Sequence, residues 1–487
     1  MEDIWQAAGH AYRHASPEQG ACFAIRDGQT DVCSGSTYHD HLLSAVANGV
    51  CARADVDLAL AHTFELRLRL GLFDPVGDQP YWHVGPERVN TTASQASAWL
   101  ATLESLVLLK HDGATLPLSP GRRVAVIGPH ANATTALVGN YLGQLCPRRV
   151  GEADTLACVQ PPLAALAALN DAAPGGVTRS APGCGVSAND TSGFAAAAAL
   201  AAASDVVILA LGIDQSVEGE SRDRASIDLP PVQHALVAAV TAAVAPGTRV
   251  VAFLLNGGPV DVAAELANPR VGAVLAAGYP GVRGAAAVAA TLYGANDHLG
   301  GKLSYTVYPA AYAGQIAMSE MEWDAGVGRS HRYYAGPVVL PFGHGLALTS
   351  FALATVAAPA PAQAVLQTGA GGANLTYTFA VTNTGAVPGD EVVQLYALPG
   401  ALPLQPASRL LKELLGYRRV HLAPGATAQV TFSVGAAALA LADKASGDIV
   451  STPGAWTLRA TNGVASALEF NVTVAGPQVV LVPFPAY

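Results

Sequence analysis

The spacing of apolar and polar positions divides the chain into three regions. Before about residue 75 the apolar residues recur with a helical period, most clearly over 55–73, where Gly71 lies near the expected helix end. Another helix is expected at about 93–106. From residue 104, short apolar runs ending in glycine alternate with helical stretches. From residue 374 the apolar period becomes two, which is typical of half-buried strands.

The middle region has the pattern of a parallel sheet. Continuous apolar strands that alternate with helices indicate a sheet whose two faces are both covered. Strands are predicted at 122–129, 204–212, 248–257 and 272–281, with helices at 194–203, 232–244 and 284–292. Ligands bind at the carboxyl ends of such strands. The loops that start at Gly128, Gly212, Asn256 and Gly278 are therefore the places to look for a site.

The last region reads as a separate all-β domain. Residues 352–372 are rich in Ala, Pro and Gly and are predicted to form a linker. After it come short alternating segments separated by Gly, Pro and Asn turns, which favour a β-sandwich of about 100 residues.

Composition and charge exclude several classes of protein. Of 487 residues, 51% are hydrophobic and 13% charged, which excludes a largely disordered chain. With 26 basic and 36 acidic residues and no basic run, a nucleic-acid partner is not expected. Stretches of about 18 strongly apolar residues are absent, so no membrane span is expected.

Cysteines and sequons point to a secretory route. Cys146, Cys158 and Cys184 lie in a loop-rich stretch and are candidates for a disulfide, with small buried thiols as the alternative. Five N-x-S/T sequons occur, and together they favour glycosylation and secretion. They are at Asn90, Asn132, Asn189, Asn374 and Asn471.

Two candidate ligand sites can be set aside on spacing. The segment RVAVIGPHANAT follows a strand, but it is not G-x-G-x-x-G and no Walker lysine follows, so a nucleotide binder is disfavoured. His10 and His14 stand four apart, and His39 and His41 flank an aspartate. No HExxH motif or third ligand accompanies them, so surface or capping histidines are predicted and no metal site.

The loop over 212–230 carries the densest chemistry in this charge-poor chain. A solvated polar loop would explain its composition, but its place after a buried strand also suits a carboxyl group that donates a proton. Its charged residues are Asp214, Glu218, Glu220, Arg222, Asp223, Arg224 and Asp228.

An ordered set of motifs resembles glycoside hydrolase family 3. ESLVLLKHDGATLPLSPGRRVAVIGPHAN resembles the entry to that family's second domain, and GIDQSVEGESRDR resembles a loop of its β-xylosidase/α-L-arabinofuranosidase branch. LLNGGPVDV, AGYPG, GGKLSYTVYP and RYYAGPVVLPFGHGL follow in the family's order. KELLGYRRVHLAPG resembles its terminal fibronectin type III-like domain. The resemblance extends over essentially the whole chain.

The resemblance implies α/β plus all-β architecture in three parts. These are the remnant of a (β/α)8 barrel at 1–85, an α/β sandwich domain with a mostly parallel sheet at 104–347, and a fibronectin type III-like β-sandwich at 374–475. It also implies retaining hydrolysis by two carboxyl groups, a barrel Asp as nucleophile and a Glu of the second domain as acid/base, without a cofactor.

The resemblance assigns roles to particular residues. Glu220 is the expected acid/base because it fits an E-x-x-[DS]-R spacing, with Glu218 as the alternative and with Asp223 and Arg224 holding the loop by ion pairing. The family's nucleophile lies in a Ser-Asp-Cys stretch, which this sequence lacks. We therefore expect a chain truncated at its amino terminus, since Glu2 and Asp3 belong to the helix that follows that stretch.

The resulting prediction is an exo-β-1,4-xylosidase-like glycosidase that acts on xylo- or arabino-oligosaccharides in the extracellular space or cell wall. Two alternatives stay open: a non-catalytic carbohydrate-binding or interaction protein on the same fold, and a β-glucosidase. The sequence does not fix the oligomeric state.

Overall fold

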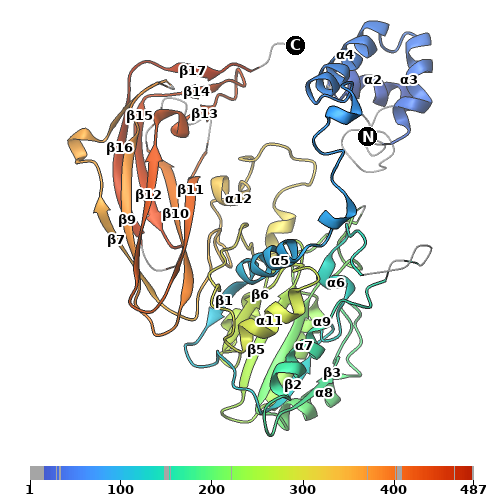
Figure 1. Cartoon of the computed structure of the whole chain (residues 1–487), viewed down its shortest axis with the longest axis vertical. Coiled ribbons are helices and arrows are strands. Elements are labelled where there is room, and N and C mark those ends of the chain that lie inside the picture. The colour runs from blue at the N-terminus through green and yellow to red at the C-terminus, as the bar shows by residue number, and fades with distance from the viewer. Residues whose placement is uncertain are drawn as a thin grey trace. The chain divides into compact units, whose positions relative to one another are not determined.

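The computed structural model describes residues 16–484 apart from residues 29, 32–34, 147–152, 154, 221, 370, 401, 403–408 and 465–466. The chain forms two compact units, Met1–Ser94 and Gln95–Tyr487. Figure 1 shows the elements of both along the chain.

The first unit is helical, as its apolar period predicts. It contains α2 (Pro17–Arg26), α3 (Thr37–Ala47) and α4 (Arg53–Arg69), then two short 3₁₀ turns, η1 (Val76–Asp78) and η2 (Pro86–Arg88). A disulfide joins Cys22 on α2 to Cys51 just before α4, a pairing that the sequence did not indicate. Only Ala59 of α4 is buried.

In the second unit, which takes up the greater part of α5 (Thr92–Ser105), this helix leads into a six-stranded sheet of order β1-β6-β5-β4-β2-β3. All neighbouring pairs are parallel except β1 with β6. The mostly parallel sheet is thus confirmed, and β1 and β3 add to the four predicted strands. The strands are β1 (Val107–His111), β2 (Arg123–Ile127), β3 (Val177–Ala181), β4 (Val206–Gly212), β5 (Arg249–Leu255) and β6 (Ala273–Ala276).

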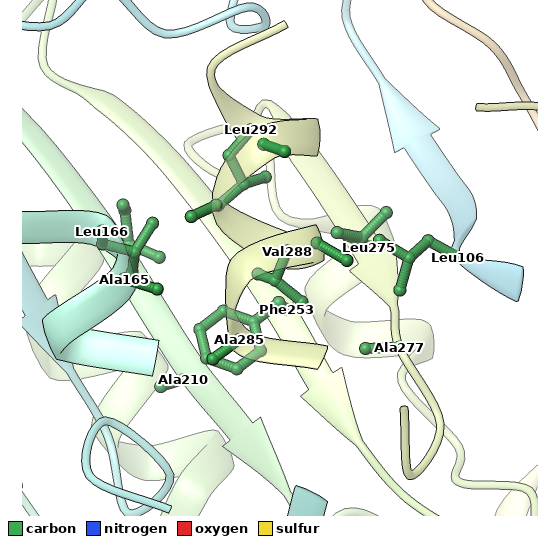
Figure 2. Close-up of a cluster of buried hydrophobic side chains, with 14 of the residues drawn as sticks. Leu106, Ala165, Leu166, Ala210, Phe253, Leu275, Ala277, Ala285, Val288 and Leu292 are labelled. Atoms are coloured by element: carbon green, nitrogen blue, oxygen red, sulfur yellow. The ribbon is translucent and has the colours of Figure 1, made fainter. Parts of the chain in front are cut away.

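Helices cover both faces of this sheet, so its central strands are apolar on both sides. On one face α7 (Pro162–Asn170) and α11 (Gly284–Leu292) pack over Phe253 of β5, and Figure 2 shows Val288 and Leu166 in that cluster. On the other face lie α8 (Phe194–Ala202) and α9 (Pro231–Ala243). Shorter helices, α6 (Thr135–Val138), α10 (Ala263–Ala267), η3 (Ala310–Gly314) and α12 (Ser330–Tyr333), occupy the connections.

The carboxyl-terminal part of the second unit is an all-β sandwich, as predicted. Its main sheets have the orders β11-β10-β15-β16-β8 and β12-β9-β7, with a small sheet β13-β14-β17. Tyr377, Phe379 and Trp456 are among its buried core residues. The elements are β7 (Phe351–Ala357), η4 (Pro361–Gln363), β8 (Val365–Gln367), β9 (Leu375–Asn383), β10 (Gly389–Pro399), β11 (Glu413–Leu422), β12 (Thr427–Val434), η5 (Ala436–Leu439), β13 (Leu441–Ala442), β14 (Ile449–Ser451), β15 (Gly454–Thr461), β16 (Ala467–Ala475) and β17 (Val479–Val482).

The linker predicted at 352–372 is wrong. This segment forms β7, which pairs with β9, and β8, which pairs with β16. Its small residues suit edge strands as well as a linker, and only the pairing partners, supplied by later strands, distinguish the two.

A second disulfide joins Cys146 to Cys158, one of the two pairings expected for Cys146, whereas Cys184 is a buried free thiol. The asparagines of all five sequons are exposed. Among the described residues no helix is long and apolar enough to cross a membrane.

Candidate active site

The 212–230 loop leaves the sheet at the carboxyl end of β4, next to the ends of β2 and β5. Gly212 has a φ of 128°, and a Cβ there would overlap the Leu255 carbonyl oxygen, so glycine is required where the strand ends. The fully buried Gln233 of α9 accepts from the Gly212 N–H at 2.9 Å and donates to the Gly212 and Val186 carbonyls, each at 2.7 Å. The base of the loop is thereby fixed.

The loops after β4, β5 and β6 line an open cavity of about 370 Å³. Three of the four loops singled out from the sequence therefore meet at one site, as expected for strand ends on one edge of a sheet. The lining residues are Asn140, Tyr141, Glu218, Gly219, Glu220, Arg222, Asp223, Arg224, Gly257, Gly258 and Tyr279.

Glu218 is the most extensively hydrogen-bonded group in this cavity. Its Oε1 accepts from the backbone N–H of Gly257 at 2.7 Å and of Gly258 at 3.1 Å, and from the Tyr279 hydroxyl at 2.8 Å. Its Oε2 lies 3.2 Å from Nε of Arg224. With only 16% of this side chain exposed, the carboxylate oxygens are committed to protein donors that link three loops.

Two arginines hold the loop from within. Arg224, 11% exposed, pairs with Glu218 and donates from Nη1 to the Pro259 carbonyl at 3.0 Å. Arg222 donates from Nη1 to the carbonyls of Gln215 and Ser216, both at 2.9 Å. Asp223, expected to take part in ion pairing, is exposed on the cavity wall.

Glu220 differs from Glu218 in its surroundings although only one residue separates them. It is exposed and faces the same cavity. Its contact is with Tyr141: hydrogen bonding to the Glu220 carboxylate raises the pKa of the Tyr141 phenol. Both glutamates line the cavity, but Glu220 is exposed, whereas the Glu218 side chain is only 16% exposed.

Several cavity residues were missed by sequence reasoning. Tyr279 comes after β6, and burial, followed by its hydrogen bond to Glu218, raises its pKa. Asn140 and Tyr141 follow the short helix α6 in a segment with no charge pattern. Gly257 and Gly258 lie in a predicted loop, but their contact with a carboxylate 39 and 40 residues away left no trace in the spacing.

A charged network supports the far end of the loop. His234 on α9 lies between the buried Glu265, with Nδ1 to Oε1 at 2.7 Å, and Asp228, with Nε2 to Oδ1 at 3.1 Å. The hydrogen bond to Glu265 is the main cause that raises the pKa of His234 to about 9, and Asp228 adds to it. The imidazolium joins α9, α10 and the loop.

The histidines weighed as metal ligands do not come together in the described part of the chain. His39 is exposed and contacts its neighbour Asp40 at 2.7 Å. His10, His14, Glu2 and Asp3 lie outside the described residues.

Comparison with known families identifies both parts of the second unit. Residues 106–348 match the glycosyl hydrolase family 3 C-terminal domain, and residues 391–463 match the fibronectin type III-like domain. The order of the two matches is the order of the motifs along the chain.

Relatives align with nearly all of the chain. It is 35% identical to a probable exo-1,4-beta-xylosidase, bxlB, of Aspergillus clavatus, over 100% of this chain and 61% of the relative. It is 34% identical to Beta-D-xylosidase 1 of Arabidopsis thaliana, over 87% of this chain and 55% of the relative. The chain thus spans about three-fifths of the length of these curated relatives.

Solved structures of glycosidases share the fold of this chain. A GH3 exo-beta-xylosidase (XlnD) in complex with a xylobiose aziridine probe superposes with a TM-score of 0.80 at 28% identity, over 99% of this chain and 61% of that one. A beta-glucosidase from Listeria innocua in complex with glucose shares the fold with a TM-score of 0.73 at 24% identity, over 95% of this chain and 60% of that one. With these domain matches and with relatives that align along the whole of it, the chain belongs to glycosyl hydrolase family 3, of which it carries the C-terminal domain and the fibronectin type III-like domain.

Proposed function

We propose that this chain is the acid/base-bearing part of a retaining β-xylosidase, with Glu220 as the general acid and base. The observation that carries this proposal is the contrast between the two glutamates. The Glu218 carboxylate pairs with Arg224 and accepts hydrogen bonds from two backbone amides and from Tyr279, whereas Glu220 is exposed to the cavity.

In this proposal each part of the loop has a separate task. Glu220 protonates the departing glycosidic oxygen and then takes a proton from the water that releases the sugar. Glu218, the alternative acid/base, keeps the Gly257–Gly258 turn and Tyr279 in place through its hydrogen bonds. Arg224 acts with Glu218, to which it is paired.

A retaining mechanism also needs a nucleophilic carboxylate about 5–5.5 Å from the acid/base. The family resemblance assigns it to a Ser-Asp-Cys stretch that the 487 residues do not contain. We therefore propose that the nucleophile belongs to a part of the family's architecture that these 487 residues do not include. We expect the chain alone to be inactive on aryl β-xylosides.

Xylo- or arabino-oligosaccharides are the proposed substrates because relatives that are 34% and 35% identical to the chain are named as xylosidases. The exposed sequons and the two disulfides support an extracellular or cell-wall location. A non-catalytic carbohydrate-binding protein and a β-glucosidase remain as the alternatives that the test below distinguishes.

The test uses a chimera in which the Aspergillus clavatus relative supplies its remaining amino-terminal portion. We expect it to release xylose from xylobiose and from an aryl xyloside with a good leaving group. Glu220→Gln should reduce turnover of xylobiose strongly, but it should reduce formation of the glycosyl-enzyme from the activated xyloside much less. Azide should restore breakdown of that glycosyl-enzyme, because it replaces the water that the general base activates.

The outcomes separate the alternatives. Binding of xylobiose without turnover in the chimera would favour the non-catalytic protein, and a preference for aryl glucosides would favour the β-glucosidase. If Glu218→Gln shows the azide-rescued pattern and Glu220→Gln behaves as the unmodified chimera, the assignment of Glu220 is wrong.

A further inference from the structure

Two histidines and a buried aspartate converge where the α/β part of the second unit meets its β-sandwich. His298 comes from the loop after α11, and Asp390 and His421 come from β10 and β11. Nδ1 of His421 lies 2.7 Å from Oδ1 of Asp390, and Nδ1 of His298 lies 3.4 Å from Oδ2. The three ligand atoms all lie within 4.8 Å of one another.

The backbone fixes this convergence. Asp390 and His421 are direct partners in the β10–β11 register, so their side chains are neighbours on one face of the sheet. On the other side, the Asn296 amide donates to the Leu103 carbonyl at 3.1 Å, and the His298 N–H donates back to Asn296 at 3.0 Å. The loop that carries His298 is thereby tied to Leu103, and Arg419 of β11 donates to the His298 carbonyl at 2.6 Å.

The charges around this cluster favour a cation. Asp390 is only 2% exposed, and its Oδ2 accepts from Nε of Arg419 at 2.6 Å. Asp297 lies 3.8 Å from Nε2 of His298, and Glu104 lies 3.6 Å from Nε of Arg419. Three carboxylates against one guanidinium leave an excess of two negative charges, with Nδ1 of His298 buried and without a hydrogen-bond partner among the described residues.

We propose that His298, Asp390 and His421 form a structural binding site for Zn²⁺ or a similar transition-metal dication, which joins the α/β domain to the β-sandwich. Two imidazole nitrogens and one carboxylate are a common zinc ligand set, and an exposed edge at His421 leaves room for water as the fourth ligand. Tetrahedral ligand atoms about 2.1 Å from zinc are about 3.4 Å apart. Nδ1 of His298 is 3.4 Å from Oδ2 of Asp390, whereas Nδ1 of His421 is 2.7 Å from Oδ1 and would have to move away from it to bind the same ion.

The surroundings have the features of an outer shell. Histidines that bind metal usually present their second ring nitrogen to a carboxylate, and carboxylates that bind metal are hydrogen-bonded in turn. Nε2 of His298 and Nε2 of His421 both face Asp297, at 3.8 and 4.0 Å. Arg419 donates to Oδ2 of Asp390, so Oδ1, which contacts Nδ1 of His421 at 2.7 Å, is the oxygen that would bind the cation.

The test is a titration of the metal-stripped chain with Co²⁺, whose visible absorption reports tetrahedral nitrogen and oxygen ligands, followed by displacement with Zn²⁺. We expect one equivalent to bind at this site and to slow hydrogen exchange in β10, β11 and residues 296–301. His298→Ala and His421→Ala should each weaken binding by more than about 100-fold, and Asp297→Asn by about tenfold.

The matched control is the double variant His10→Ala/His14→Ala, which removes the other histidine pair with ligand spacing. It should bind Co²⁺ like the unmodified chain. The proposal is overturned if the unmodified chain gives no tetrahedral Co²⁺ spectrum, or if the spectrum survives His298→Ala and His421→Ala together. Asp297→Asn keeps the test decisive if a ligand variant fails to fold, because unchanged affinity in this variant would contradict the proposed outer shell.

Discussion

Replacing Glu218 with glutamine tests whether this residue is an anchor of the site. The substitution preserves the shape of the side chain but removes its charge and turns one acceptor oxygen into a donor NH₂. In either orientation the NH₂ meets a donor: the N–H groups of Gly257 and Gly258 on one side or the Arg224 guanidinium on the other.

The size of the effect follows from these contacts. A hydrogen bond to a charged group contributes about 1.5–3 kcal/mol, and both partners of the Arg224 pair are less than a fifth exposed, so solvent screening is limited. Local opening of the Gly257–Gly258 turn should become easier by that amount. Amide exchange there should therefore accelerate by about 10- to 150-fold.

Hydrogen–deuterium exchange of a peptide that covers the two glycines measures this directly. Glu220→Gln is the matched control, because Glu220 lies in the same loop without contacting those amides, and its exchange should stay near that of the unmodified chain. Removing the Glu218 charge should also lower the raised pKa of Tyr279, although burial, the larger cause, remains. Unchanged exchange in Glu218→Gln, or equal acceleration in both variants, would refute the anchoring role.

Three further results are expected. The pKa of His234 is raised to about 9, so its stabilising contribution is complete below pH 6.5 and is lost as the pH rises through 9. The free energy of unfolding measured in urea should therefore fall by up to about 3 kcal/mol over this pH range. His234→Gln should abolish this pH dependence. A Cβ at Gly257 would lie 2.6 Å from Oε1 of Glu218, so Gly257→Ala should lower turnover by the chimera on the order of 100-fold, with normal kinetics counting against the anchored turn. The Cys22–Cys51 bridge closes a separation of 29 residues, so Cys22→Ser should destabilise the first unit by about 3–4 kcal/mol; an unchanged melting transition of that unit would contradict this.

The sequence predicted the elements that local patterns control. Strands such as β4 and β5 are apolar on both faces because helices cover both sides of the sheet, and this makes them visible as continuous runs ending in glycine. Parallel strands place their carboxyl ends on one edge, so the loops after Gly212 and Asn256 could be expected to share a site. The alternating strands β9 and β15 were equally clear, since one face is buried and the other solvated.

Only the tertiary structure separated residues that look alike along the chain. Glu218 and Glu220 differ by two positions, and either fits a family spacing, but only one meets the amides of Gly257 and Gly258. Segment 352–372 resembles a linker in composition and becomes strands because later strands pair with it.

The cluster of His298, Asp390 and His421 shows most clearly that the sequence does not reveal which distant residues meet. His298, Asp390 and His421 are separated by tens of residues and form no motif, so the sequence predicted no metal site. They meet because β10 and β11 pair in one register and pack against the loop after α11. Local periodicity reports which face of an element is buried; which distant side chains share a point in space depends on how those faces pack, and packing is decided by the whole fold.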